Sequence, residues 1–120
     1  DYAIIATGSK PVVIPIPGVE LPGVITSDEA LNLTEIPSSM VIIGGGVIGS
    51  EFAEVFSAVG CKVTIIEMLP NIIANMDQDV VSTLVFKFEN SGVDIHTDTK
   101  VVSISKGDYA AFAARTFFYQ

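Results

Sequence analysis

An apolar run in this chain ends in a cluster of glycines, and apolar residues then recur at helical spacing. Residues 40–43 are all apolar, and Gly44 to Gly46 follow directly. The positions that recur every three or four residues are Ile48, Phe52, Val55, Phe56 and Val59. This pattern predicts a buried strand, a tight loop and a helix over about residues 47–59, with the recurring side chains on the sheet. Gly60 suits the end of that helix.

Strand-like runs occur elsewhere along the chain. They are short, rich in β-branched and apolar residues and bounded by turn residues, which is the pattern expected of strands. The runs are residues 2–6, 62–67, 93–96 and 101–104.

A second helix is predicted over residues 77–90, with Val80, Leu84 and Phe88 or their neighbours inward. Gly92 is expected to stop it. Residues 27–31 resemble a short capped helix.

The connecting segments are marked by turn residues. Pro11, Pro15, Pro17 and Pro22 make residues 10–23 an extended linker rather than a helix. Residues 106–108 predict a turn.

The glycine cluster fits a dinucleotide-binding fingerprint. Gly44, Gly46 and Gly49 match G-x-G-x-x-G between a predicted strand and a predicted helix. Gly44 allows the sharp turn out of the strand, and Gly49 allows the helix to lie close to it. At Gly46 the missing side chain lets the backbone approach a pyrophosphate, at which the helix N-terminus also points its free N–H groups.

An acidic residue completes the pattern. Glu67 ends the next predicted strand, 21 positions after Gly46 (67 − 46), close to the spacing of about 20 that the fingerprint requires. Its carboxylate would accept hydrogen bonds from the ribose hydroxyls and repel a 2′-phosphate, and Met68 and Leu69 offer no arginine. The sequence therefore predicts NAD rather than NADP. The simpler alternative is a glycine-rich turn in an ordinary α/β protein, with Glu67 merely solvated.

Together these elements predict the fold class. Strand, helix, strand, helix, strand is the core of an α/β, Rossmann-like doubly wound parallel sheet in three layers. A small antiparallel β addition is expected beside it.

Composition narrows the function classes further. A chain of 120 residues is enough for one modest core, and a net charge of −8 argues against nucleic acid and anionic membranes as partners. No apolar run reaches the length of a membrane helix, and no signal peptide is visible. Cys61 is the only cysteine, which excludes an internal disulfide and indicates a reducing compartment. We expect a cytoplasmic location, or the mitochondrial matrix or a plastid if the source is eukaryotic, and no metal site.

Several motifs, in order, resemble one known family. These are residues 2–9, the proline-rich linker, residues 26–31, residues 44–51, residues 63–67, and Leu69-Pro70 followed by Asp77. They resemble the flavoprotein pyridine nucleotide-disulfide oxidoreductases, most closely the dihydrolipoamide dehydrogenase branch. The resemblance implies an NAD-binding domain with a short piece of a flanking FAD domain.

The resemblance also implies roles for particular residues. The NAD loop would be formed by Gly44, Gly45, Gly46, Val47, Ile48 and Gly49. Glu51 is similar to the glutamate beside the nicotinamide at the flavin interface, although a first-turn acid also suits the helix dipole. Glu67 resembles the ribose-binding acid. Val101 resembles the valine that packs on the adenine, and a core strand valine is the equal alternative.

The N-terminal motif is similar to the family's flavin contact. Thr7, Gly8 and Ser9 resemble the turn that touches FAD and begins the crossover to the NAD domain. Without that context they would be only a polar turn.

Other family motifs are not found in this sequence. A first glycine fingerprint for FAD and a C-x-x-x-x-C redox pair do not occur. Catalysis in the family needs two thiols that alternate with a disulfide, so Cys61 is interpreted as a buried structural thiol. His96 has no glutamate five residues later and is given no catalytic role. We therefore assign no catalytic residue, and we expect the chain alone to be inactive.

The domain organisation follows from these motifs. We expect residues 1–37 to be a crossover segment and linker, residues 38–107 the NAD-binding domain, and residues 108–120 an atypical tail that is foreign, altered or a replacement strand. The abrupt start at Asp1 suggests an excised piece. The expected cofactors are NAD here and FAD in the parent enzyme only, and the expected partners are the parent's FAD and interface domains. A homo-oligomer through the exposed strand or tail is also expected. The alternative function is a stand-alone nucleotide-binding or association module.

Overall fold

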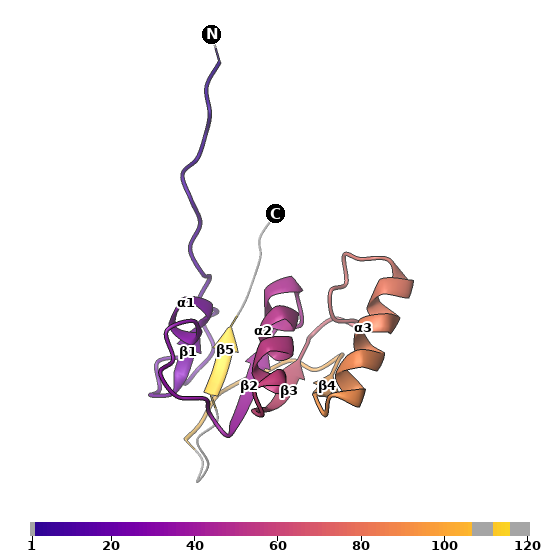
Figure 1. Cartoon of the computed structure of the whole chain (residues 1–120). Coiled ribbons are helices and arrows are strands. Elements are labelled where there is room, and N and C mark those ends of the chain that lie inside the picture. Colours follow the sequence, from indigo (N-terminus) through magenta and orange to yellow (C-terminus); the bar gives the residue numbers. More distant parts are fainter. Residues whose placement is uncertain (1, 107–111, 116–120) are drawn as a thin grey trace.

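A single parallel sheet organises the chain. The computed structural model describes residues 2–106 and 112–115. Its five strands lie in the order β1-β5-β2-β3-β4, and every pair of neighbours is parallel (Figure 1). The strands are β1 (Val24–Thr26), β2 (Ser39–Ile43), β3 (Lys62–Ile66), β4 (Asp94–His96) and β5 (Phe112–Arg115). This arrangement confirms the predicted Rossmann-like α/β fold.

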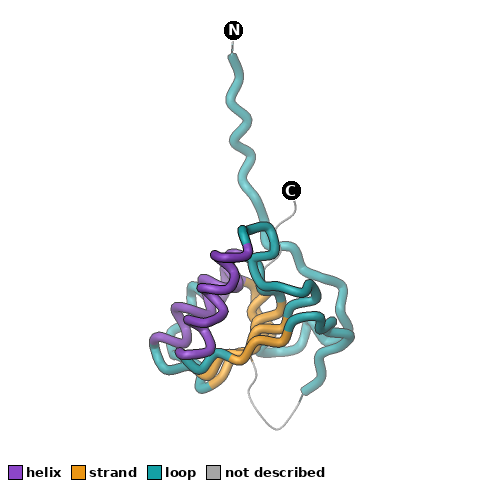
Figure 2. Tube along the Cα trace, turned by 90° about the vertical axis from the view of Figure 1, so that its right-hand side faces the viewer, coloured by secondary structure: helices purple, strands orange, loops and turns teal. Residues whose placement is uncertain are grey.

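The helices lie on one side of the sheet, and loop segments gather on the other (Figure 2). The helices are α1 (Ser27–Ala30), α2 (Val47–Ala58) and α3 (Gln78–Asn90). α2 connects β2 to β3 and α3 connects β3 to β4, so each βαβ unit places its helix on the same face. The carboxyl ends of β2 and β3 consequently open side by side at one edge.

The core lies between the sheet and the helices. Alternate residues of β2 and β3 are almost fully buried, as the period of a strand requires. Met40 and Val63 pack in one apolar cluster with Phe52 of α2 and Phe88 of α3. Phe52 also stacks on Phe56, with ring centroids 6.0 Å apart.

Only part of the predicted apolar face of α2 reaches the sheet. Phe52 and Phe56 are buried, but Val55 is 58% exposed and Val59 is 52% exposed. The prediction that these two valines face the sheet is wrong. The apolar stripe of α2 is wider than the sheet contact, and its remainder borders an open groove between the helices.

The helix ends agree with their sequence signals. Thr26 and Glu29 form a reciprocal capping box at the start of α1. Gly60 and Gly92 follow α2 and α3 with φ of 91° and 75°, a conformation that favours glycine. In α3 the inward side chains are Val81 and Phe88, whereas the neighbouring Val80 is half exposed.

Two predicted strands are not formed. Residues 2–6 have no strand and extend away from the body of the protein (Figure 1). A strand needs a neighbour for its backbone groups, and the described residues offer this segment none. Residues 101–104 are also irregular. They approach the proline-rich linker, where the Ile104 N–H donates to the Pro17 carbonyl at 2.8 Å. No antiparallel addition occurs within residues 2–106 and 112–115.

The last described strand comes from the predicted tail. β5 pairs with β1 on one side and with β2 on the other, and so joins the edge strand β1 to the rest of the sheet. The tail therefore contributes a strand to the domain. The predicted turn at residues 106–108 lies largely outside the described residues.

Candidate functional site

A glycine loop joins β2 to α2 at the carboxyl edge of the sheet. Gly44 has a φ of 106°, and its N–H donates to the Ile66 carbonyl at 2.8 Å, so the loop remains tied to β3 as it turns. A Cβ atom placed on Gly49 would lie 2.1 Å from the Gly44 oxygen. The first turn of α2 thus contacts the end of its own strand, and only glycine fits this approach.

Gly46 is the open position of the loop. It is the residue that precedes α2, with a φ of −67°, and a Cβ atom placed there would meet no atom within 4 Å. Glycine is therefore not required at this position by the protein itself. The space beside it lies at the N-terminus of a helix of 12 residues, where backbone N–H groups and the helix dipole favour an anion.

The Glu67 carboxylate is fixed beside this loop. Its Oε2 accepts a hydrogen bond from the Gly45 N–H at 2.6 Å, and its Oε1 accepts one from the Leu69 N–H at 2.7 Å. Its backbone is held as well, because Glu67 N–H donates to the His96 carbonyl and its own carbonyl accepts from Thr99. Each carboxylate oxygen keeps a lone pair for a further donor.

A hollow of about 440 Å³ opens next to Glu67. Its floor is formed by the ends of β2 and β3, and its walls by two segments that are far apart in the sequence. The residues that line it are Ile14, Pro15, Ile16, Pro17, Ile43, Gly44, Ile66, Glu67, Met68, Thr99, Lys100, Val101 and Val102. The mostly apolar lining with one carboxylate is typical of a small-molecule site.

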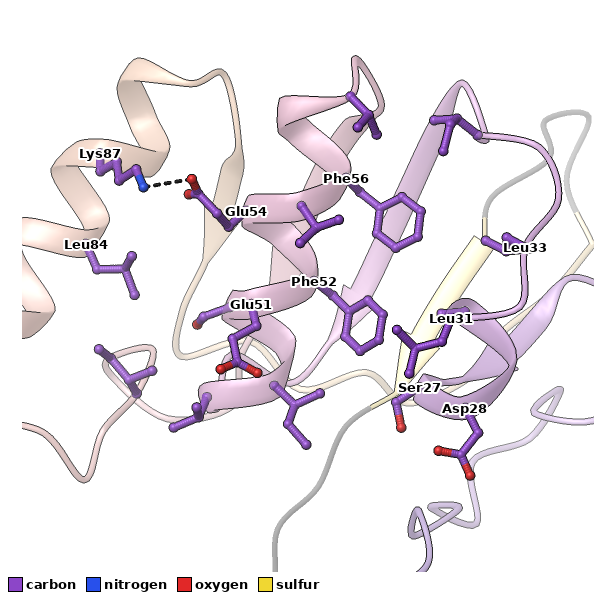
Figure 3. A pocket seen from close by; sticks show the side chains of 18 of the residues that line it. Ser27, Asp28, Leu31, Leu33, Glu51, Phe52, Glu54, Phe56, Leu84 and Lys87 are labelled. Carbon is purple, nitrogen blue, oxygen red and sulfur yellow. Dashed lines mark hydrogen bonds and ion pairs between the residues drawn. The ribbon is translucent and has the colours of Figure 1, made fainter.

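A larger apolar groove lies on the helix side of the loop. It has a volume of about 1020 Å³ and lies between α1, α2 and α3, where the Glu54 carboxylate pairs with Lys87 at 2.7 Å (Figure 3). Val47, Ile48 and Glu51 line this groove and not the hollow. Glu51 is exposed on the first turns of α2.

The structure therefore brings most of the predicted site residues to one edge. Gly44, Glu67 and Val101 share the hollow, whereas Glu51 lies beyond the glycine loop in the groove. Thr7, Gly8 and Ser9 lie in the exposed N-terminal segment, and no hydrogen bond from them to either cavity is formed among the described residues.

Sequence reasoning missed one wall of the hollow and one cation. Residues 14–17 appeared to be only a linker, and Lys100 was not considered, yet both line the hollow. No local signal marks them, because their place in the hollow depends on where the chain passes in space.

Cys61 has a structural environment. It is buried at the start of β3, and burial raises the pKa of its thiol, which keeps it protonated near neutral pH. No group of three metal-ligating side chains occurs in the described parts of the chain. Within the same residues, no helix has the length and hydropathy to cross a membrane.

Fold and site together define a Rossmann-type nucleotide-binding domain. The sequence model of the family described as pyridine nucleotide-disulphide oxidoreductase matches residues 1–116, so the chain belongs to that family. This confirms the resemblance found in the sequence. Members of the family use FAD and NAD(P) and act as multidomain enzymes.

Individual relatives agree with this assignment. Dihydrolipoyl dehydrogenase from Acholeplasma laidlawii is 49% identical over 105 residues, covering 84% of this chain and 31% of that protein. The Bacillus subtilis (strain 168) protein of the same name is 42% identical over 101 residues, covering 84% of this chain and 22% of that protein. This chain thus spans less than a third of either relative.

A solved structure shows the same fold. The Cu(II) complex of the HOCl-induced flavoprotein disulfide reductase RclA from Escherichia coli superposes with a TM-score of 0.86 at 34% identity. The match covers 92% of this chain and 29% of that one. The chain therefore resembles the pyridine nucleotide-disulfide oxidoreductase domain of dihydrolipoyl dehydrogenase.

Proposed function

We propose that this chain binds NAD(H) as the nucleotide domain of a flavin-dependent oxidoreductase of the dihydrolipoyl dehydrogenase type. The observation that carries the proposal is the Glu67 carboxylate, which two backbone N–H groups hold between the glycine loop and the hollow. A carboxylate fixed in this way is ready to accept hydrogen bonds from vicinal hydroxyls.

The positions of the two cavities support one path for the dinucleotide. The adenosine half fits the hollow, with Val101 beside the base and Glu67 at the ribose. The pyrophosphate fits the open side of Gly46 at the start of α2. The nicotinamide half would then lie toward Glu51, beyond the loop.

The roles of the site residues are binding and orientation. Bound NAD supplies hydride chemistry with a flavin, and the residues of this chain would fix its two ends relative to each other. Thr7, Gly8 and Ser9 are proposed to contact that flavin in the longer protein. Disulfide reduction needs a pair of thiols, and this chain has one cysteine, so we expect no such activity from it alone.

Calorimetry with NAD(H) and NADP(H) tests the proposal. We expect NAD(H) to bind at least about tenfold more tightly, because the Glu67 carboxylate repels a 2′-phosphate. Equal affinities would contradict the proposal. Gly46→Asp is the variant that tests the position of the pyrophosphate. Its side chain enters open space and leaves the packing intact, while its negative charge opposes the pyrophosphate. Undiminished NAD(H) binding by this variant would place the cofactor elsewhere.

A further inference from the structure

Ile73 has an unusual backbone conformation for its residue type. Its φ is 41°, in the left-handed region that β-branched residues rarely adopt. Such a conformation is strained and persists only where the surroundings hold it. The side chain of Ile73 is 6% exposed and belongs to the core cluster, so its burial offsets the strain.

The strained residue contacts the glycine loop through its backbone. The Ile73 N–H donates to the Gly45 carbonyl at 2.7 Å. The Ser50 hydroxyl, on the first turn of α2, donates to the same carbonyl at 3.3 Å, and Ser50 is 5% exposed. Since the Gly45 N–H is bound to Glu67, both backbone groups of Gly45 are fixed.

The fixed carbonyl determines where the next N–H points. The Gly45 carbonyl and the Gly46 N–H belong to one planar trans peptide, so they point in opposite directions. With the carbonyl turned toward Ile73 and Ser50, the Gly46 N–H is turned away from them. Within the described residues it has no hydrogen-bond partner, and the space beside Gly46 is open.

We propose that Ile73 and Ser50 are positioning residues that hold the peptide between Gly45 and Gly46 so that its N–H faces the pyrophosphate of a bound dinucleotide. The inference rests on the proposed function. The left-handed φ and the hydrogen bond belong to the same residue, whose N–H ends on the Gly45 carbonyl.

Titrations followed by amide NMR test this role. Inorganic pyrophosphate is titrated into the ¹⁵N-labelled wild-type protein while the Gly46 amide signal is followed. NAD is titrated into a separate sample. Glycine at position 73 can adopt the left-handed φ but does not fix the backbone there. In Ile73→Gly we therefore expect the affinity for pyrophosphate to fall about fivefold or more. Ser50→Ala removes only the longer bond and should lower it about threefold. Ser50→Ala also tests the inference if Ile73→Gly does not fold.

Val81→Ala is the matched control. Val81 is 2% exposed and belongs to the same core cluster, but it makes no bond to the loop. Its truncation should lower stability and leave the pyrophosphate response unchanged. Equal losses in Ile73→Gly and Val81→Ala would overturn the inference, because Ile73 would then act through stability alone.

The two proposals fail in different ways. No response of the Gly46 amide to pyrophosphate in the wild type would overturn the inference. A response to pyrophosphate without binding of NAD would overturn the proposed function and leave the positioning role intact.

Discussion

Gly46 and Gly49 belong to one motif but are glycine for different reasons. A side chain at Gly49 would collide with the Gly44 carbonyl, whereas a side chain at Gly46 would enter open space. Under the proposed function the first glycine leaves room for a pyrophosphate, whereas the second is needed for the helix to pack.

Alanine substitutions should separate these two reasons. We expect Gly49→Ala to lower the free energy of unfolding by about 1–3 kcal/mol, because the backbone atoms that it meets must move. Gly46→Ala should leave the free energy of unfolding within about 0.5 kcal/mol of that of the wild type and weaken the binding of NAD instead. Urea unfolding combined with calorimetry measures both. A stable Gly49→Ala variant would contradict the packing argument.

Lys100 adds a charge to the hollow that the sequence motif does not include. It lines the same cavity as Glu67, and an ammonium there would attract a 2′-phosphate, whereas Glu67 repels it. We expect Lys100→Ala to lower the residual affinity for NADP(H) several-fold while leaving that for NAD(H) nearly unchanged. Calorimetry on both cofactors checks this, with exposed Lys62 as the control position. A larger loss of NAD(H) binding would place the lysine at the pyrophosphate.

How far the site could be predicted depends on distance along the chain. Gly44, Gly46 and Glu67 follow a fixed spacing because one βαβ unit carries them all. Lys100 and Ile73 reach the same site from loops whose path depends on tertiary packing. No periodicity marks them.

At the scale of elements, α1 is the clearest case of local control. It has four residues, and Thr26 and Glu29 cap it reciprocally, with the Thr26 N–H donating to the Glu29 carboxylate at 2.6 Å. These bonds, from the Thr26 backbone first and from its hydroxyl second, lower the pKa of Glu29. The charged carboxylate is therefore the stabilising form.

This capping box predicts a pH dependence. A lowered pKa means that the contribution of Glu29 is present above its ordinary pKa and is lost as pH falls through the value in the folded protein. Glu29→Gln should therefore lower stability at pH 7 and converge with the wild type in acid. Thr26→Ala should cost about 1 kcal/mol. Thermal unfolding between pH 7 and pH 3 measures both, and a constant difference between Glu29→Gln and wild type would contradict the assignment.

The two long helices were predicted from strong local signals, whereas strand-like composition identified β2, β3 and β4 but also two segments that form no strand. α2 and α3 have apolar periodicity and stop glycines, and both form close to the expected bounds. Residues 2–6 and 101–104 have strand-like composition, but composition does not supply the neighbouring strand that fixes a backbone in a sheet.

At the scale of the whole molecule, the N-terminal segment is the most exposed apolar part described. Tyr2, Ile4 and Ile5 are each at least 89% exposed, and among the described strands β1 and β4 lie at the edges of the sheet, where a strand offers its backbone groups to another chain. An exposed apolar segment favours association between copies, for which exchange of such a segment is a low-cost route.

We therefore predict a homodimer or higher oligomer at about 100 μM, a concentration at which even weak interfaces are populated. Light scattering of the full chain, of a chain without residues 1–9 and of the double variant Ile4→Lys, Ile5→Lys measures this. The truncated chain and the double variant should be smaller species, because the first lacks the apolar segment and the second replaces its two isoleucines by charged residues. A monomeric full chain would contradict the prediction. The aromatic residues Phe117, Phe118 and Tyr119 are tested in the same way by removing residues 116–120, which leaves β5 in place.

The place of β5 between β1 and β2 has a consequence for folding kinetics. Ala113 pairs with Val24, 89 positions earlier (113 − 24), and with Val41, 72 positions earlier (113 − 41). Closing such long loops is entropically slow. During synthesis, β2, β3 and β4 can assemble with α2 and α3 as soon as they emerge, whereas β1 has no partner until residues 112–115 have left the ribosome. This domain should therefore pass through an intermediate in which β2, β3 and β4 are already paired, while β1 stays unpaired until β5 joins it to β2.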